Sequence, residues 1–107
     1  MSMNMLVWKW SEDYDSPAKR KRQKIKFRDV TSAFAETGDH PAIAATDMSA
    51  YLEKVFEEFG PESPDLPFVV ERYENCVVFN YGSSVRFEIV PKLGNLAMAM
   101  GLNGSEF

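Results

Sequence analysis

The chain of 107 residues contains one cysteine, Cys76, and one histidine, His40. A single cysteine cannot form an intrachain disulfide, so the fold cannot depend on one. One histidine and one cysteine, with no carboxylate cluster at helical spacing beside them, do not provide the ligands of a zinc or di-iron site. We therefore predict no metal and no cofactor, and the cysteine count fits a reducing, cytoplasmic compartment.

Long hydrophobic runs are also missing from the sequence. No segment approaches the ~18 consecutive apolar residues that a membrane-spanning helix needs. At the N-terminus, no basic residue precedes the short apolar stretch and charged residues follow it at once, which is unlike a secretory signal. The sequence therefore predicts a cytoplasmic protein without a membrane partner.

The common phosphate-binding and nucleophile motifs are absent: there is no GxGxxG, no GxxxxGK[ST] and no GxSxG. Cys76 falls in a predicted strand, where a lone cysteine usually serves as a small buried apolar side chain. A Cys-His dyad with His40 is arithmetically possible, but neither residue has a partner at catalytic spacing. We interpret both residues as structural, identify no catalytic residue and predict that the protein is not an enzyme.

The composition is that of an ordinary globular domain. The chain is 45% apolar and 26% charged, with eight Phe, four Tyr and two Trp. A chain of this length buries roughly 60 to 70% of its unfolded surface, enough for one modest core. We expect residues 1–107 to form a single domain with an aromatic-rich core.

Three segments have the period-two apolar pattern of β-strands, namely residues 5–10, 68–73 and 76–81. In the first, Leu6, Trp8 and Trp10 alternate with Val7 and Lys9. The other two flank the dipeptide at 74–75, which predicts a β-hairpin, although Glu-Asn is a poorer tight turn than Asn-Gly and a longer or bulged turn stays open.

Helical spacing of apolar residues predicts helices at 27–37 and 47–59. The segment 84–100 is ambiguous, because residues 85–89 alternate like a strand while its apolar residues also fit one helical stripe. Pro91 is tolerated in a first helical turn and costly further inside, so we favour a helix that begins at about Ser84 or Pro91 and ends at Met100. The predicted fold class is α+β, a small antiparallel sheet of three to four strands with about three helices packed on one face.

The charge is unevenly distributed along the chain. Residues 1–28 sum to +5 and residues 29–107 to −9, giving the net −4. The cations of the basic run are Lys19, Arg20, Lys21, Arg22, Lys24, Lys26 and Arg28. Since Ser16-Pro17 and the lack of apolar periodicity indicate a loop at about 11–26, we expect this run to be exposed and mobile around Arg20 to Gln23.

Two functions remain open for the basic run. Clustered cations can neutralise phosphates and release counterions, which would make the protein a nucleic-acid-associated accessory protein using Lys19 to Arg28. No aromatic residue lies between 15 and 26 to stack on bases, however, and the acidic remainder repels phosphate. We favour a solvated counterweight to the acidic body that binds nucleic acid only weakly or non-specifically.

A second charged surface is predicted on the helix at 47–59 and the loop after it. Its candidate partner-binding residues are Glu53, Glu57, Glu58, Glu62 and Asp65. Such a surface could dock a basic protein and speed association by electrostatic steering. The alternative is an ordinary solvated helix face.

Four stretches distributed over most of the chain carry a family resemblance: "VWKWSEDYD" at 7–15, "GDHPAI" at 38–43, "FVVERYENCVVFNY" at 68–81 and "GLNGSEF" at 101–107. The chain resembles small, single-domain bacterial proteins that begin with a short Val-Trp strand and end with a helix, a Gly-Leu exit and a polar tail. Some of these are similar to immunity proteins that neutralise a cognate polymorphic toxin. The resemblance implies a non-enzymatic module that occludes the surface of a protein partner, such as a basic toxin domain.

Overall fold

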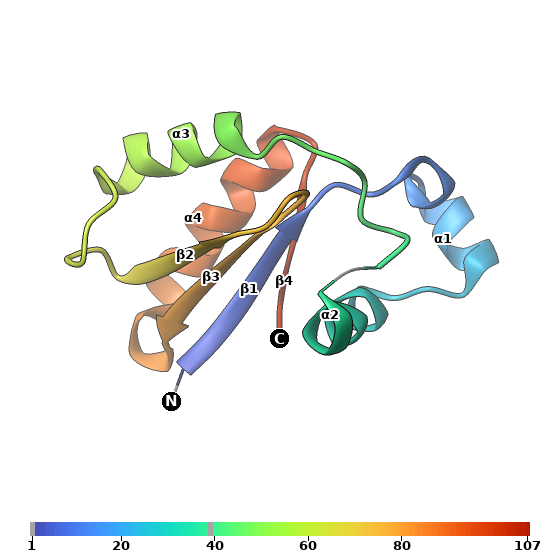
Figure 1. Ribbon diagram of the computed structural model, residues 1–107, viewed down its shortest axis with the longest axis horizontal. Helices are drawn as coiled ribbons and strands as arrows, with labels where there is room; N and C mark the ends of the chain where they lie inside the picture. Colours follow the sequence, from blue (N-terminus) through green and yellow to red (C-terminus); the bar gives the residue numbers. More distant parts are fainter. Residues whose placement is uncertain (1, 39) are drawn as a thin grey trace.

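The computed structural model describes residues 2–38 and 40–107, so Asp39 of the "GDHPAI" stretch lies outside the described residues. Its centre is one antiparallel sheet of four strands in the spatial order β2-β3-β1-β4 (Figure 1). The strands are β1 (Ser2–Trp8), β2 (Phe68–Arg72), β3 (Val77–Gly82) and β4 (Asn103–Glu106). Together with the helices, this sheet confirms the predicted α+β class.

The helices are α1 (Pro17–Gln23), α2 (Phe27–Thr37), α3 (Ser49–Phe59) and α4 (Arg86–Ala99), with short 3-10 turns η1 (Glu12–Tyr14) and η2 (Ser83–Val85). The helices predicted at 27–37, 47–59 and 84–100 are confirmed, as is the hairpin of β2 and β3. At its tip, the Tyr73 amide donates to the Cys76 carbonyl at 3.0 Å, which leaves Glu74 and Asn75 as the turn. Among the described residues, no helix is both long and apolar enough to cross a bilayer.

The ambiguous segment before residue 91 is helical, and Pro91 lies inside α4. Proline has no amide hydrogen, so the carbonyl of Phe87 cannot receive its usual helical hydrogen bond. Tertiary packing offsets that cost, because Ile89, Leu93 and Ala97 recur every four residues and are all buried. Burial against the sheet therefore decides between the two periodicities that the sequence contains.

The helices cover both faces of the sheet, which corrects the prediction that they pack on one face. On one face, Met5, Val7 and Phe79 join residues of α3 and α4 in a first core. On the opposite face, a second core contains these side chains of the strands and of α2: Leu6, Trp8, Val78, Val30 and Phe34. Because β1 and β3 are apolar at successive positions, whose side chains point to opposite faces, each face needs a cover.

The polar C-terminal stretch forms the edge strand β4, which the sequence did not predict. It pairs with β1, with Met5 opposite Glu106 and Trp8 opposite Asn103. The Tyr81 hydroxyl donates to Glu106 at 2.7 Å, and the Arg86 guanidinium lies 2.8 Å from the same carboxylate. These contacts from β3 and α4 hold in place a strand whose own residues have little β-propensity.

The basic segment is an α-helix and not the loop predicted at 11–26. The Ser16 hydroxyl accepts a hydrogen bond from the Lys19 amide at 3.2 Å, and Pro17 occupies the first helical position. Serine at the cap followed by proline is a common helix start. The helix ends at Lys24, which adopts a left-handed backbone conformation with φ of 56°.

Candidate functional site

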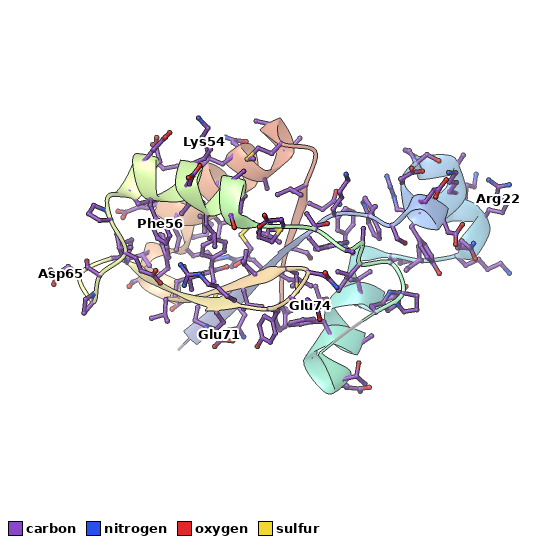
Figure 2. The ribbon with its side chains drawn as sticks, turned by 45° about the horizontal axis from the view of Figure 1, so that its top comes forward. Arg22, Lys54, Phe56, Asp65, Glu71 and Glu74 are labelled. Carbon is purple, nitrogen blue, oxygen red and sulfur yellow. The ribbon has the colours of Figure 1, made fainter. Side chains whose placement is uncertain are left out.

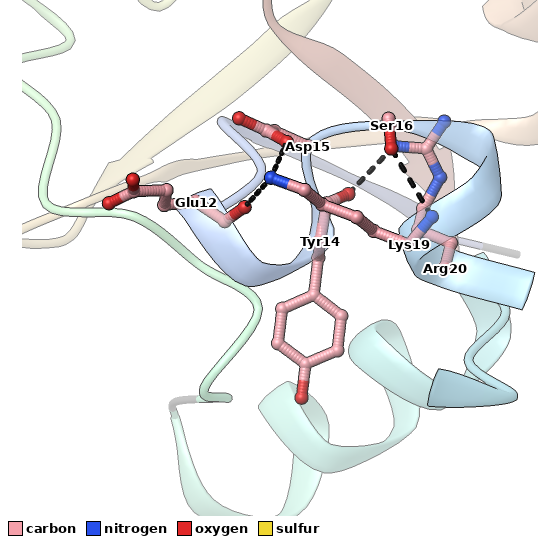
Figure 3. A network of polar contacts seen from close by, with 6 residues as sticks. All are labelled: Glu12, Tyr14, Asp15, Ser16, Lys19 and Arg20. Carbon is pink, nitrogen blue, oxygen red and sulfur yellow. Dashed lines mark hydrogen bonds and ion pairs between the residues drawn. The ribbon is translucent and has the colours of Figure 1, made fainter. Parts of the chain in front are cut away.

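Two cations of the basic run hold α1 against the rest of the chain (Figure 3). The Lys19 ammonium lies 2.9 Å from the Asp15 carboxylate and donates to the Glu12 carbonyl at 2.9 Å. The Arg20 guanidinium donates to the Tyr14 carbonyl at 2.8 Å and stacks 4.8 Å from the ring centre of Trp10. Arg20 is thus half-buried and not exposed as predicted, whereas Lys21, Arg22 and Gln23 are exposed as predicted.

The other five cations of the run are exposed and form no ion pair within the described part of the chain: Lys21, Arg22, Lys24, Lys26 and Arg28. They extend from the outer end of α1 to the start of α2. Figure 2 shows Arg22 at one end of the molecule and Asp65 at the other. The charge asymmetry of the sequence therefore becomes a separation along the longest axis, 42 Å in extent.

All five predicted acidic residues are exposed, but three of them have a cation beside them. Glu57 lies 3.5 Å from Lys54, Glu58 lies 3.9 Å from Lys92, and Glu62 forms a two-pronged ion pair with Arg72. The hydrogen bonds from Arg72 lower the pKa of Glu62 below its usual value.

Glu53 and Asp65 form no ion pair among the residues described. Five carboxylates beside three cations leave this surface with a charge of about −2, which gives only weak attraction for a basic partner at physiological ionic strength.

Cys76 and His40 both lie on the α2 side of the sheet. Cys76 is 3% exposed and belongs to the second core. The His40 ring accepts a hydrogen bond from the Ala42 amide at 2.9 Å and lies edge-on to Tyr14. No three His, Cys, Asp or Glu side chains within residues 2–38 and 40–107 lie close enough together to hold a metal ion.

A groove of about 350 Å³ opens on the same face, at the end of the sheet that α2 leaves uncovered. The strand register explains where it begins. Leu6 of β1 lies opposite Val78 of β3, and both are buried under α2. Two residues further along, Asn4 lies opposite Asn80, and both line the groove. The face thus changes from apolar to polar where its covering helix ends.

Aromatic side chains form one side of this groove. Phe34 of α2 lies edge-on to Tyr73 and to Phe107, with ring centres 5.0 Å and 6.1 Å apart. Tyr73 is 44% exposed and Phe107 is 37% exposed, although both are large and apolar enough to be buried. Exposed aromatic residues around a hollow are typical of binding surfaces.

Glu71 of β2 places a carboxylate in the groove. Its two oxygens accept hydrogen bonds from the Tyr73 hydroxyl at 3.0 Å and from the Asn80 amide at 2.6 Å. The hydrogen bond to Glu71 raises the pKa of the Tyr73 phenol. Among the described residues, no Lys or Arg forms an ion pair with Glu71, so its negative charge is held in position but not neutralised.

Further negative potential surrounds this carboxylate. Gly38, which ends α2, lines the groove and also a neighbouring hollow that includes Glu74. The last carbonyls of a helix lack intrahelical partners and carry partial negative charge. Figure 2 shows Glu71 and Glu74 on the β2–β3 hairpin, well apart from Lys54 on α3. We call the hollow lined by Phe34, Glu71, Tyr73, Asn80 and Phe107 the Glu71 groove.

The sequence contains one local signal for this groove. Glu71 and Tyr73 lie two residues apart at the end of β2, and Asn80 interrupts the buried positions of β3. Period two places these polar residues on one face. Their proximity to Phe34 and Phe107 follows only from the packing of α2 and β4.

Comparisons of the chain with protein-family models, curated proteins and solved structures found no match. The resemblance to immunity-type proteins therefore stays a prediction.

Proposed function

We propose that the chain is a non-enzymatic, cytoplasmic protein-binding module that acts by covering a surface of a basic protein partner. The observation that carries this proposal is the Glu71 groove, where exposed aromatic rings lie beside a carboxylate that forms no ion pair within the described part of the chain. Aromatic residues are enriched in the centres of protein interfaces, where they contribute much of the binding energy. The family resemblance supports an immunity-type partner, a basic toxin domain.

The acidic surface of α3 has a secondary role in this proposal. Glu53 and Asp65 form no ion pair among the described residues, while the other three carboxylates each have a cation beside them. Such a surface adds to long-range attraction of a basic partner, and this attraction weakens as salt is added. We assign the short-range contacts with the partner to the groove. We assign the long-range attraction of the partner to the net charge of −9 in residues 29–107.

Affinity capture from the lysate of the native host tests the proposal. The wild-type chain should retain a stoichiometric protein, and a Tyr73→Ala bait should lose it. Phe87→Ala is the matched control, because Phe87 is also an exposed aromatic residue but lies on α4, which packs on the other face. Loss of the partner with the control variant but not with Tyr73→Ala would contradict the assignment to the groove.

The basic end of the molecule supports a second candidate function, association with nucleic acid. The five exposed cations between Lys21 and Arg28 lie together and are not neutralised within the described chain. Each phosphate contact steepens the salt dependence, so contacts by all five would give a slope of about −4.5 in a plot of log K against log salt.

A titration of duplex DNA from about 50 to 200 mM salt measures that slope. The leading proposal expects weak binding that does not depend on base sequence. Tight, sequence-selective binding near physiological salt that Lys21→Gln/Arg22→Gln abolishes would make the nucleic-acid function the leading one.

A further inference from the structure

We propose that the Glu71 groove is a receptor for one arginine side chain of the protein partner. This inference rests on the proposed function for the source of the arginine, but the recognition chemistry belongs to the groove alone. No residue of the groove was among the binding residues that the sequence indicated.

The carboxylate of Glu71 is arranged to accept more hydrogen bonds than it receives. A carboxylate has about four lone-pair positions, and here the Tyr73 hydroxyl and the Asn80 amide occupy one on each oxygen. Both donors come from this chain and fix the orientation of the group. The remaining positions on the two oxygens suit a guanidinium, whose paired N–H groups match a carboxylate in a two-pronged contact.

The aromatic residues suit the flat, weakly hydrated guanidinium as well. A cation over an aromatic face is attracted by the electrons of the ring, and the attraction is stronger where water is excluded. Tyr73 and Phe107 are partly exposed beside the carboxylate, and each contacts Phe34 edge-on, which fixes the orientation of the rings. The chain already uses this kind of contact elsewhere, where Arg20 covers Trp10.

The polar groups of the groove favour a cation over other ligands. Glu71, the nearby Glu74 and the carbonyl end of α2 repel an anion. One carboxylate provides too few oxygen ligands for a divalent metal ion. A volume of about 350 Å³ is at the small end of the range for ligand pockets, which suits a side chain better than a large ligand.

The occupant must come from another molecule, because the nearby arginines of this chain have other partners. Arg72 follows Glu71 directly in the sequence but pairs with Glu62, and Arg86 pairs with Glu106. Arg20 lies against Trp10. Among the described residues, no arginine of this chain therefore neutralises the Glu71 carboxylate that lines the groove.

The test uses the full chain and two small probes, N-acetyl-arginine amide and N-acetyl-citrulline amide. Citrulline has nearly the same shape as arginine but no charge. In ¹⁵N-resolved NMR titrations, arginine should shift the signals of Asn80, Asn4 and Gly38 saturably with millimolar affinity, and citrulline should bind at least about tenfold more weakly.

Two groove variants and one control variant test the specificity of the titration. Glu71→Gln preserves the shape of the side chain and should weaken arginine binding about tenfold. Tyr73→Leu removes the aromatic face and should weaken it about threefold. Glu88→Gln removes an exposed carboxylate on α4, outside the groove, and should leave binding unchanged. The amide spectra of the variants report directly whether each one is folded.

Equal shifts from arginine and citrulline, no saturable shifts in the groove, or an equal loss of binding with Glu88→Gln would overturn the inference. None of these results needs the partner protein, so they leave the proposed function to the capture experiment. The wild-type chain could capture a partner that Tyr73→Ala does not retain, while the groove shows no saturable binding of arginine. That pair of results would reject arginine as the ligand and support the proposed function.

Discussion

The two faces of the sheet differ in how completely they are covered. Under α3 and α4, apolar side chains of β1, β2 and β3 meet two helices along the whole sheet, and Val7 and Phe79 are fully buried. Under α2 the apolar positions end at Leu6 and Val78, and Asn4, Asn80 and Glu71 continue the face without a cover. A closed face contributes mainly stability, while an open one with placed polar groups is available for recognition.

The largest expected effect is the loss of unfolding free energy when a buried side chain of the closed face is truncated. Phe79 of β3 is fully buried and lies edge-on to Tyr51 of α3 and Phe68 of β2, so Phe79→Ala should cost about 3 to 5 kcal/mol of unfolding free energy. Val69 on the open face is 65% exposed, and Val69→Ala should cost less than about 0.5 kcal/mol. Chemical denaturation measures both. Similar losses for the two variants would show that the faces do not differ.

Alanine substitutions at two glycines near Met5 test how closely the closed face is packed. A Cβ at Gly104 of β4 would collide with the terminal methyl group of the buried Met5 side chain, which is flexible and can shift, so Gly104→Ala should destabilise by no more than about 1 kcal/mol. A Cβ at Gly94 of α4 would stand at an ordinary 3.8 Å from the same methyl group, so Gly94→Ala should stabilise by up to about 1 kcal/mol. Thermal unfolding distinguishes the two signs. A stabilising Gly104→Ala would mean that β4 does not pack closely on Met5.

Two tyrosines give the faces different responses to alkali. Burial raises the pKa of Tyr51, whose hydroxyl donates to the Leu93 carbonyl, while the hydrogen bond to Glu71 raises the pKa of the exposed Tyr73. A raised folded pKa means that the folded chain retains its proton longer than the unfolded chain. The stability from Tyr51 is therefore complete below the unfolded pKa of about 10 and falls as the pH rises above it.

Urea denaturation between about pH 9 and 11 measures this dependence. Tyr51→Phe should flatten the decline in stability, although it also loses the hydrogen bond to Leu93. Tyr73→Phe should flatten it much less, since Tyr73 is partly exposed. Identical pH profiles for the wild type and Tyr51→Phe would exclude Tyr51 as the source of the dependence.

How far the sequence predicts this architecture depends on whether each element carries its own pattern. The strands β1, β2 and β3 and the helices α2 and α3 follow from apolar periodicity. The helix α1 was missed because it has no apolar stripe and its start signal, Ser16-Pro17, also marks loops. The strand β4 was missed because Glu106 is held by Tyr81 and Arg86, which are distant in the sequence.

The candidate site was less predictable than the fold. The acidic residues of α3 are exposed as expected, but Lys54, Lys92 and Arg72 approach three of them through packing that charge counting does not show. The Glu71 groove depends on where α2 ends relative to the sheet and on Phe107 reaching Phe34. Such a site is a property of the tertiary structure. Its only local sign in the sequence is the period-two spacing that places the polar residues of the β2–β3 hairpin on one face.

The smallest expected effect concerns Glu71 itself. Its hydrogen bonds to Tyr73 and Asn80 lie on the surface, so Glu71→Gln should change the unfolding free energy by less than about 0.5 kcal/mol. Asn80→Ala should behave similarly. A loss above about 2 kcal/mol in either variant would indicate that these residues serve the fold and not recognition.

Hydrogen–deuterium exchange of the complex with the captured partner tests most directly whether the open face is the binding face. The account predicts slower exchange of the backbone amides around Asn4, Gly38, Tyr73 and Asn80, with little change in α3 and α1. Protection confined to α3 and the loop at 60–67, or to α1, with unchanged exchange around the Glu71 groove would contradict it.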